Sequence, residues 1–90
     1  MLTKVTEFKF EDGHRLVVWF NDGTHGTHDF SSLLARGGAM IEPLRDPAYF
    51  RRGFLELGAL TWPNGFDIAP EWLRREMAAA GELRHAAAAE

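Results

Sequence analysis

Residues 5 to 30 alternate between apolar and polar positions, which is typical of β-strands that bury one face. The alternation predicts a first strand over Val5–Glu11, a second over His14–Phe20 and a third over Thr24–Phe30. Asp12-Gly13 and Asn21-Asp22-Gly23 are residue types that form tight turns between antiparallel strands. The pattern therefore predicts a three-stranded antiparallel meander.

The same alternation assigns side chains to faces. In the first strand, Phe8 and Phe10 share one face and Val5 lies on the other. One face of the second strand carries three apolar residues, Leu16, Val18 and Phe20. Its opposite face is apolar too, because it carries Val17 and Trp19. An antiparallel sheet can leave one face in water, so we expect a helix of the same chain to cover Val17 and Trp19, and a dimer or partner surface is the alternative.

Three helical segments are predicted after the meander. Ser31-Ser32 can cap a short helix that Arg36-Gly37-Gly38 ends. Asp46-Pro47 starts a second helix, with an acidic N-cap and then proline at the first helical position. Pro70 starts the last helix, and Gly81 ends it. The inward stripe of that helix is predicted to contain Trp72, Leu73, Met77 and Ala80.

Two short strands, 54–57 and 59–62, are predicted on either side of Gly58. They lead into Trp62-Pro63-Asn64-Gly65-Phe66-Asp67, where each residue type imposes a local constraint. Trp62 needs apolar cover, Pro63 fixes φ, and Asn64-Gly65 can adopt the positive φ of a turn. Asp67, like Asp46, is predicted to accept backbone hydrogen bonds at the start of a helix. The alternative for these two carboxylates is acid/base chemistry in a shared cleft.

The predicted fold class is α+β. An antiparallel sheet would combine the N-terminal meander with two short C-terminal strands, accompanied by two short helical turns and one C-terminal helix. Ninety residues are enough for one domain with a single core. We place this domain at residues 1–81 and expect the alanine-rich tail, 82–90, to be a frayed helix or disordered.

The composition narrows the function classes. The chain has no cysteine, which excludes a disulfide framework, a thiolate zinc site and a cysteine nucleophile. Its formal net charge of -3 and pI of about 5.8 lack the basic excess that nucleic-acid binders use. No apolar run resembles a signal peptide or reaches the roughly 18 residues of a membrane span. We therefore expect a soluble, cytoplasmic protein without a membrane partner.

His25, His28 and Asp29 are the candidate metal ligands. Residues three apart on a regular strand point to opposite faces, so the two imidazoles are expected to diverge unless Gly26 forms a bulge. A zinc site needs three or four converging ligands. Together with Ser31, His28 and Asp29 supply the residue types of a nucleophilic triad, but triad members normally come from separate elements. We predict no metal site, no cofactor and no catalytic residues.

A second candidate cluster is basic and aromatic. Arg45, Arg51 and Arg52 lie close in sequence to Tyr49 and Phe50, and such a combination can bind RNA or DNA. The acidic net charge favours the other interpretation, in which the three arginines simply form a solvated face.

Two blocks of the chain resemble a known family. They are Pro-Leu-Arg-Asp-Pro-Ala-Tyr-Phe at residues 43–50 and Leu-Thr-Trp-Pro-Asn-Gly-Phe-Asp-Ile-Ala-Pro-Glu-Trp-Leu at residues 60–73. With the preceding strands, residues 5–75 resemble the small prokaryotic family called domain of unknown function 2442. The resemblance implies an α+β domain whose gene often lies beside that of another small protein, in a toxin–antitoxin-like arrangement. It implies no catalytic residues, and Ala69 departs from the pattern, because serine is common there as a helix cap.

These observations predict a non-enzymatic protein-interaction or regulatory module, the antitoxin-like half of a two-gene pair. Its partner would be a small protein encoded by a neighbouring gene, contacted either through the apolar patch around Val17 and Trp19 or through an exposed strand edge. A homodimer is also expected to be feasible. One alternative is a nucleic-acid-associated regulator that uses the three arginines. Another is a small metal-binding protein that uses the two histidines and Asp29.

Overall fold

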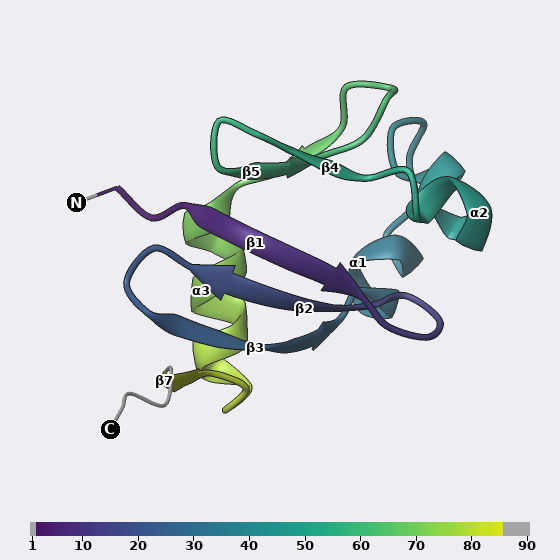
Figure 1. Cartoon of the computed structure of the whole chain (residues 1–90). Helices are drawn as coiled ribbons and strands as arrows, with labels where there is room; N and C mark the ends of the chain where they lie inside the picture. The colour runs from purple at the N-terminus through teal and green to yellow at the C-terminus, as the bar shows by residue number, and fades with distance from the viewer. Residues whose placement is uncertain (1, 86–90) are drawn as a thin grey trace.

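A computed structural model describes residues 2–85 of the chain. Its elements in chain order are β1 (Val5–Phe10), β2 (Arg15–Phe20), β3 (Thr24–Asp29), α1 (Ser31–Ala35), the 3-10 helix η1 (Glu42–Arg45), α2 (Pro47–Phe50), β4 (Phe54–Glu56), β5 (Ala59–Thr61), β6 (Asp67–Ile68), α3 (Pro70–Ala79) and β7 (Arg84–His85). The fold class is α+β, as predicted. Figure 1 shows α3 crossing behind the strands β1, β2 and β3, whose other face carries no helix among the described residues.

The N-terminal sheet contains the predicted meander, with strand order β1-β2-β3-β7 and antiparallel pairing throughout. The face predicted for Val5 from the alternation was wrong. The register between β1 and β2 shifts between Val5 and Glu7, so one extra residue, Thr6, lies in a bulge. The extra residue turns Val5 back to the face of Phe8, and Val5 is buried with an exposed fraction of 3%. A bulge is not visible in the apolar pattern.

The tail was predicted to be frayed from residue 82, and this is wrong for the part that the structure describes. Arg84 and His85 form β7 and pair with His25 and Thr24 at the edge of β3. Leu83 packs against the core. A segment without an apolar stripe is therefore ordered by tertiary contacts that local sequence does not reveal. Residues 86–90, the rest of that prediction, lie outside the described part of the chain.

The two predicted C-terminal strands belong to a separate sheet of order β4-β5-β6. Leu57 and Gly58 form the turn between β4 and β5, both with positive φ, of 53° and 82°. Val5 donates its N–H to the carbonyl of Gly58 at 2.8 Å, which ties this turn to the start of β1. The third strand, β6, was not predicted, because two residues are too few to show an alternating pattern.

The Trp62 segment has the architectural role that its sequence predicts. Trp62 is 1% exposed, and its indole N–H donates to the carbonyl of Phe50 at 2.8 Å. Asn64 accepts a hydrogen bond from Phe66 N–H at 3.1 Å and donates to the carbonyl of Met40 at 2.9 Å. After Pro63, the turn closes through Gly65, whose φ is 92° and whose N–H bonds to the Trp62 carbonyl at 2.8 Å. The segment therefore joins β5 to β6 and pins the loop around residue 40.

The two aspartates differ in their roles at helix starts. Asp46 caps α2 as predicted: its carboxylate accepts from Ala48 N–H at 3.0 Å, and Pro47 occupies the first turn. The prediction that Asp67 caps the last helix was wrong. Asp67 lies in β6, and α3 follows Ala69 without a side-chain cap. The pairing of β6 with β5 holds Asp67 away from the helix start.

Helix α3 packs on the inner face of the N-terminal sheet. Leu73 and Met77 are fully buried, and a Cβ on Gly26 of β3 would lie 3.2 Å from the methyl group of Met77. The predicted stripe was too wide, since Trp72 is only half-buried and Ala80 is exposed. The buried core contains Val5, Leu16, Val18, Phe20, Phe30, Leu33, Leu34, Leu44, Phe50, Leu60, Trp62, Ile68, Leu73 and Met77. Within residues 2–85, no helix has the length and apolarity needed to span a membrane.

Candidate functional site

The outer face of the N-terminal sheet is the first candidate site, and Trp19 lies at its centre. Cross-strand pairing aligns Glu7, Trp19, His25 and Arg84 in one row across β1, β2, β3 and β7. The indole of Trp19 stacks on the His25 ring, with ring centroids 6.0 Å apart and planes inclined by 15°. The Nδ1 atom of His25 is buried without a hydrogen-bond partner among the described residues. The stack on Trp19 is thus a contact that this imidazole makes without a hydrogen bond at Nδ1.

The cover expected for Val17 and Trp19 is not a helix of the described chain. Leu16 and Val18, which point the other way, are the residues that α3 covers and are fully buried. Val17 and Trp19 are half-buried, shielded by neighbours on their own sheet. Beside Val17 and His25 lies a hollow of about 370 Å³, which Glu82 and Arg84 line on its far side. The outer face is thus an aromatic and aliphatic strip with charged margins.

His25 and His28 diverge, as their spacing on β3 predicts. His28 pairs with Leu16 and therefore shares the inner face, whereas His25 pairs with Trp19 on the outer face. The Nδ1 atom of His28 lies 2.8 Å from the Glu82 carboxylate. No three potential metal ligands gather anywhere in residues 2–85. His28 instead helps to hold the segment that follows α3 against β3.

Asp29 anchors the start of α1. Its carboxylate accepts from the Ser31 hydroxyl at 2.7 Å and from the Ser31 N–H at 2.9 Å. These two hydrogen bonds, the hydroxyl bond first, lower the pKa of Asp29 below its ordinary value. The predicted cap at Ser31 was wrong in detail, because the N-cap position is Phe30 and the oxygen that satisfies the backbone comes from Asp29. Asp29 and Ser31 thus bond to each other, whereas His28 bonds to Glu82, so the three do not form the relay of a nucleophilic triad.

The three candidate arginines each contact a different part of the chain. Arg45 donates to the carbonyl of Leu34 at 2.9 Å, at the end of α1. Arg51 donates to the carbonyl of Glu11 at 3.1 Å, at the β1–β2 hairpin. Arg52 lies over the Tyr49 ring at 5.4 Å. All three are exposed, and two of them serve as donors to backbone carbonyls.

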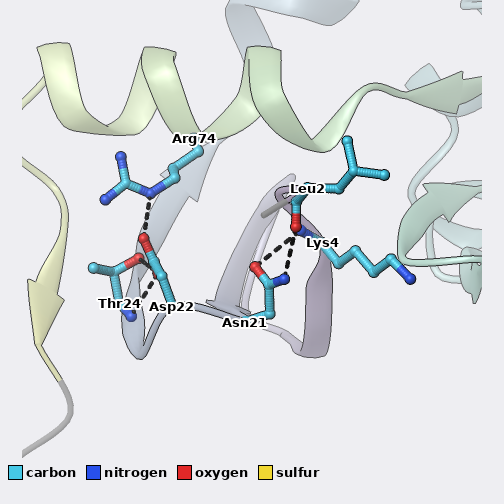
Figure 2. A network of polar contacts seen from close by, with 6 residues as sticks. All are labelled: Leu2, Lys4, Asn21, Asp22, Thr24 and Arg74. Atoms are coloured by element: carbon cyan, nitrogen blue, oxygen red, sulfur yellow. Dashed lines mark hydrogen bonds and ion pairs between the residues drawn. The ribbon is translucent and has the colours of Figure 1, made fainter.

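A polar network joins α3 to the β2–β3 turn (Figure 2). Arg74 donates to the Asp22 carboxylate at 2.8 Å, and the Thr24 hydroxyl donates to the same group at 2.6 Å. The Thr24 hydroxyl bond is the largest cause that lowers the pKa of Asp22. Burial is the next largest and raises the pKa, and the Thr24 N–H and Arg74 lower it further, so that the net direction is downward. Next to it, Asn21 bonds to the carbonyl of Leu2 at 2.7 Å and to the N–H of Lys4 at 3.0 Å. These contacts hold the β2–β3 turn against α3 and against the residues that precede β1.

A groove on the helix side of the sheet is the second candidate site. It lies between α1 and the start of α3, and its volume is about 370 Å³. The lining residues are Leu33, Arg36, Ile41, Phe66, Asp67, Ile68, Ala69 and Trp72. The guanidinium of Arg36 lies 5.9 Å from the ring centroid of Trp72. A second hollow of about 190 Å³ shares Leu33, Arg36 and Trp72 and continues toward Glu76.

Comparison with family models gives a match, over residues 5–79, to the family described as protein of unknown function (DUF2442). The chain belongs to the DUF2442 family. Neither the curated proteins nor the solved structures contain a match to it. The matched range includes Val17, Trp19 and His25, so the centre of the outer face belongs to the DUF2442 domain. Glu82 and Arg84, which border the same face, lie beyond the matched range.

Sequence reasoning identified Val17 and Trp19 but missed the groove of this DUF2442 domain. The groove depends on Arg36, Asp67 and Trp72, which lie far apart in sequence and come from α1, β6 and α3. Trp72 was assigned to the inward stripe, since a tryptophan next to a buried leucine normally belongs to the core. The sequence contained one sign against this assignment. Trp72 and Leu73 are adjacent on the helix, so their side chains cannot both point straight toward the core.

Proposed function

We propose that this domain is a non-enzymatic protein-interaction module of the cytoplasm, the antitoxin-like half of a two-gene pair. It binds a small protein partner through the outer face of its N-terminal sheet. The observation that carries the proposal is the half-buried Trp19, stacked on His25 in the middle of a sheet face over which no described helix packs.

The chemistry of that face suits protein recognition. Tryptophan is among the residues that contribute most to binding energy at protein interfaces, where it lies centrally and is surrounded by polar residues. Val17 extends the apolar strip, and Glu7 and Lys9 on β1 and Arg84 on β7 provide exposed charges around it. Binding would act by occlusion, because the strip and the surface of the partner that contacts it would each cover the other.

The residues that carry reactive groups support a non-enzymatic role, because they take part in structural contacts. His28 is paired with Glu82, Asp29 bonds to Ser31, and Asp46 caps α2. An acid/base pair requires two carboxyls in one cleft. Asp46 and Asp67 belong to different elements, and Asp46 does not line the groove in which Asp67 lies.

The test is co-expression of the tagged protein with the product of the neighbouring gene, followed by affinity capture. Wild-type protein is expected to retain the partner, and Trp19→Ala to lose at least about tenfold in affinity, as expected for a central interface residue. Trp72→Ala is the matched control, because it truncates another half-buried tryptophan on the helix side. Equal retention by Trp19→Ala and wild type would contradict the proposed surface, and no retention at all would contradict the proposed partner.

A second copy of the chain, instead of the neighbouring gene product, could cover the outer face. Size-exclusion chromatography with light scattering on the protein alone tests this alternative. If a second copy covers the outer face, the wild type is a dimer and Trp19→Ala a monomer. That outcome would replace the neighbouring gene product by a homodimer on the same face. A monomer in both cases keeps the face open for the heterologous partner.

A further inference from the structure

The groove between α1 and α3 has a continuous apolar wall. Five side chains form it, from α1, the loop before η1, the Trp62 turn, β6 and α3, namely Leu33, Ile41, Phe66, Ile68 and Trp72. Phe66 and Trp72 are only half-buried, so part of their ring surface faces the groove. A volume of about 370 Å³ is at the small end of the range of roughly 300–1,000 Å³ for ligand pockets. It can hold one or two large apolar side chains.

The charges around this wall are unevenly distributed. Asp67 lies at one end of the groove, and Glu76 lines the hollow that continues it at the other. Neither carboxylate forms an ion pair with another residue of the described chain. Arg36, the one cation that lines the groove, is already stacked against Trp72. The groove and its continuation are therefore lined by two carboxylates outside any ion pair, by Asp29, which is bonded to Ser31, and by one arginine, Arg36, whose guanidinium lies over the Trp72 indole.

We propose that this groove binds a segment of a partner polypeptide in which a large apolar side chain is followed by lysine or arginine. The apolar side chain would occupy the wall between Ile41 and Trp72. The basic side chain would pair with Asp67 or Glu76 at either end, with its stem along the aromatic rings. Charge complementarity selects this occupant, since an acidic segment would add to the excess of carboxylates over arginine in this lining. The chain's net charge of -3 acts in the same direction at longer range.

This site is separate from the surface of the proposed function, because it lies on the helix side of the sheet and Trp19 lies on the outer face. The three tryptophans make the two sites distinguishable by NMR. Each indole N–H gives its own signal, and the signals of Trp19 and Trp72 can be assigned by their loss in Trp19→Phe and Trp72→Phe. A ligand in the groove must move the Trp72 signal. A ligand on the outer face must move that of Trp19.

The experiment titrates the full-length protein with three blocked peptides at low salt. They are Gly-Leu-Phe-Lys-Arg-Gly, its acidic counterpart Gly-Leu-Phe-Glu-Glu-Gly, and the polar basic peptide Gly-Ser-Ser-Lys-Arg-Gly. The apolar basic peptide is expected to move the Trp72 signal and leave those of Trp19 and Trp62 in place. Its affinity should exceed that of either control peptide about tenfold, and the advantage over the acidic peptide should shrink as salt screens the charges.

Two variants sharpen the result. Asp67→Asn and Glu76→Gln should each weaken the apolar basic peptide about threefold, the scale of an exposed ion pair. Glu7→Gln on the outer face makes the same change in net charge and should have no effect. The proposal is overturned if no peptide moves the Trp72 signal at millimolar concentration, if the acidic peptide binds as well, or if Glu7→Gln weakens binding as much as Asp67→Asn. None of these results bears on capture of a partner through Trp19.

Discussion

Trp62 in the buried core and Trp19 on the outer face of the N-terminal sheet show how differently one residue type can be used. Trp62 is 1% exposed, its indole N–H is bonded to Phe50, and its ring leaves room only for glycine at position 53. Trp19 is half-buried, lies flat on His25 and faces outward from a sheet that packs its helix on the other side. Burial with a satisfied polar atom marks the architectural tryptophan. Partial exposure on an open face is the feature on which the proposed role of Trp19 in recognition rests.

The largest difference is expected in the free energy of unfolding. Trp62→Ala should lower it by about 3–5 kcal/mol, because a large cavity forms and the Phe50 carbonyl keeps only the Gly53 N–H of its two donors. Trp19→Ala should lower it by about 1 kcal/mol, since its side chain is only partly removed from water. Urea denaturation of both variants measures the two values. Equal losses would erase the distinction between the two residues.

The close contact under Trp62 provides the next test. A Cβ on Gly53 would lie 2.9 Å from the indole ring, so Gly53→Ala should cost about 1–3 kcal/mol through displacement of the ring. Gly13→Ala is the control: a Cβ there would meet no atom within 4 Å, and only its positive φ of 65° opposes the change. Thermal unfolding compares the two. A loss at Gly53 no greater than that at Gly13 would mean that Trp62 is packed less tightly than described.

Asp46 and Asp67, which both lie near a proline, are expected to differ by a smaller amount in their contribution to the free energy of unfolding. Asp46→Ala should cost about 1 kcal/mol, because Ala48 N–H loses its acceptor at the start of α2. Asp67→Ala should change the free energy of unfolding by less than about 0.5 kcal/mol, as an exposed residue without a capping bond. Chemical denaturation at neutral pH decides between them, and a reversed order would restore Asp67 as the cap of α3.

The smallest predicted effect is a dependence of the free energy of unfolding on pH, which arises from Asp22 in the β2–β3 turn. The pKa of Asp22 is lowered in the folded state, chiefly by the Thr24 hydroxyl, so its ionised form stabilises the fold. This stability is fully present above the ordinary value of 3.8 and is lost as the pH falls through the lower folded pKa. Asp22→Asn should therefore flatten the acid limb of a plot of stability against pH. An unchanged slope in that variant would assign the acid sensitivity to other groups, of which Asp29 is the first to test.

The parts of the fold that local patterns specify were predictable. The alternation between residues 5 and 30 predicts β1, β2 and β3, and Asp46-Pro47 predicts α2 together with its cap. The bulge at Thr6 and the two-residue strands β6 and β7 were not predictable, since each depends on pairing with a distant segment. The cap assigned to Asp67 failed for the same reason, because β6 pairing decides where that carboxylate lies.

The candidate sites were predictable only where one element forms them. Val17 and Trp19 stand out because β2 alone shows two apolar faces. The divergence of His25 and His28 likewise follows from their spacing on one strand. The groove needs Arg36, Asp67 and Trp72 from three elements, and the pairing of His28 with Glu82 spans 54 positions in sequence. Such combinations appear only when the chain is folded.

The most direct test of the outer face as a recognition surface is the affinity of Trp19→Ala for the neighbouring gene product, measured by calorimetry on protein shown to be folded. The account predicts a loss of at least about tenfold for this variant and an affinity close to wild type for Trp72→Ala. Wild-type affinity in Trp19→Ala, with the loss appearing in Trp72→Ala instead, would contradict it and move recognition to the helix side.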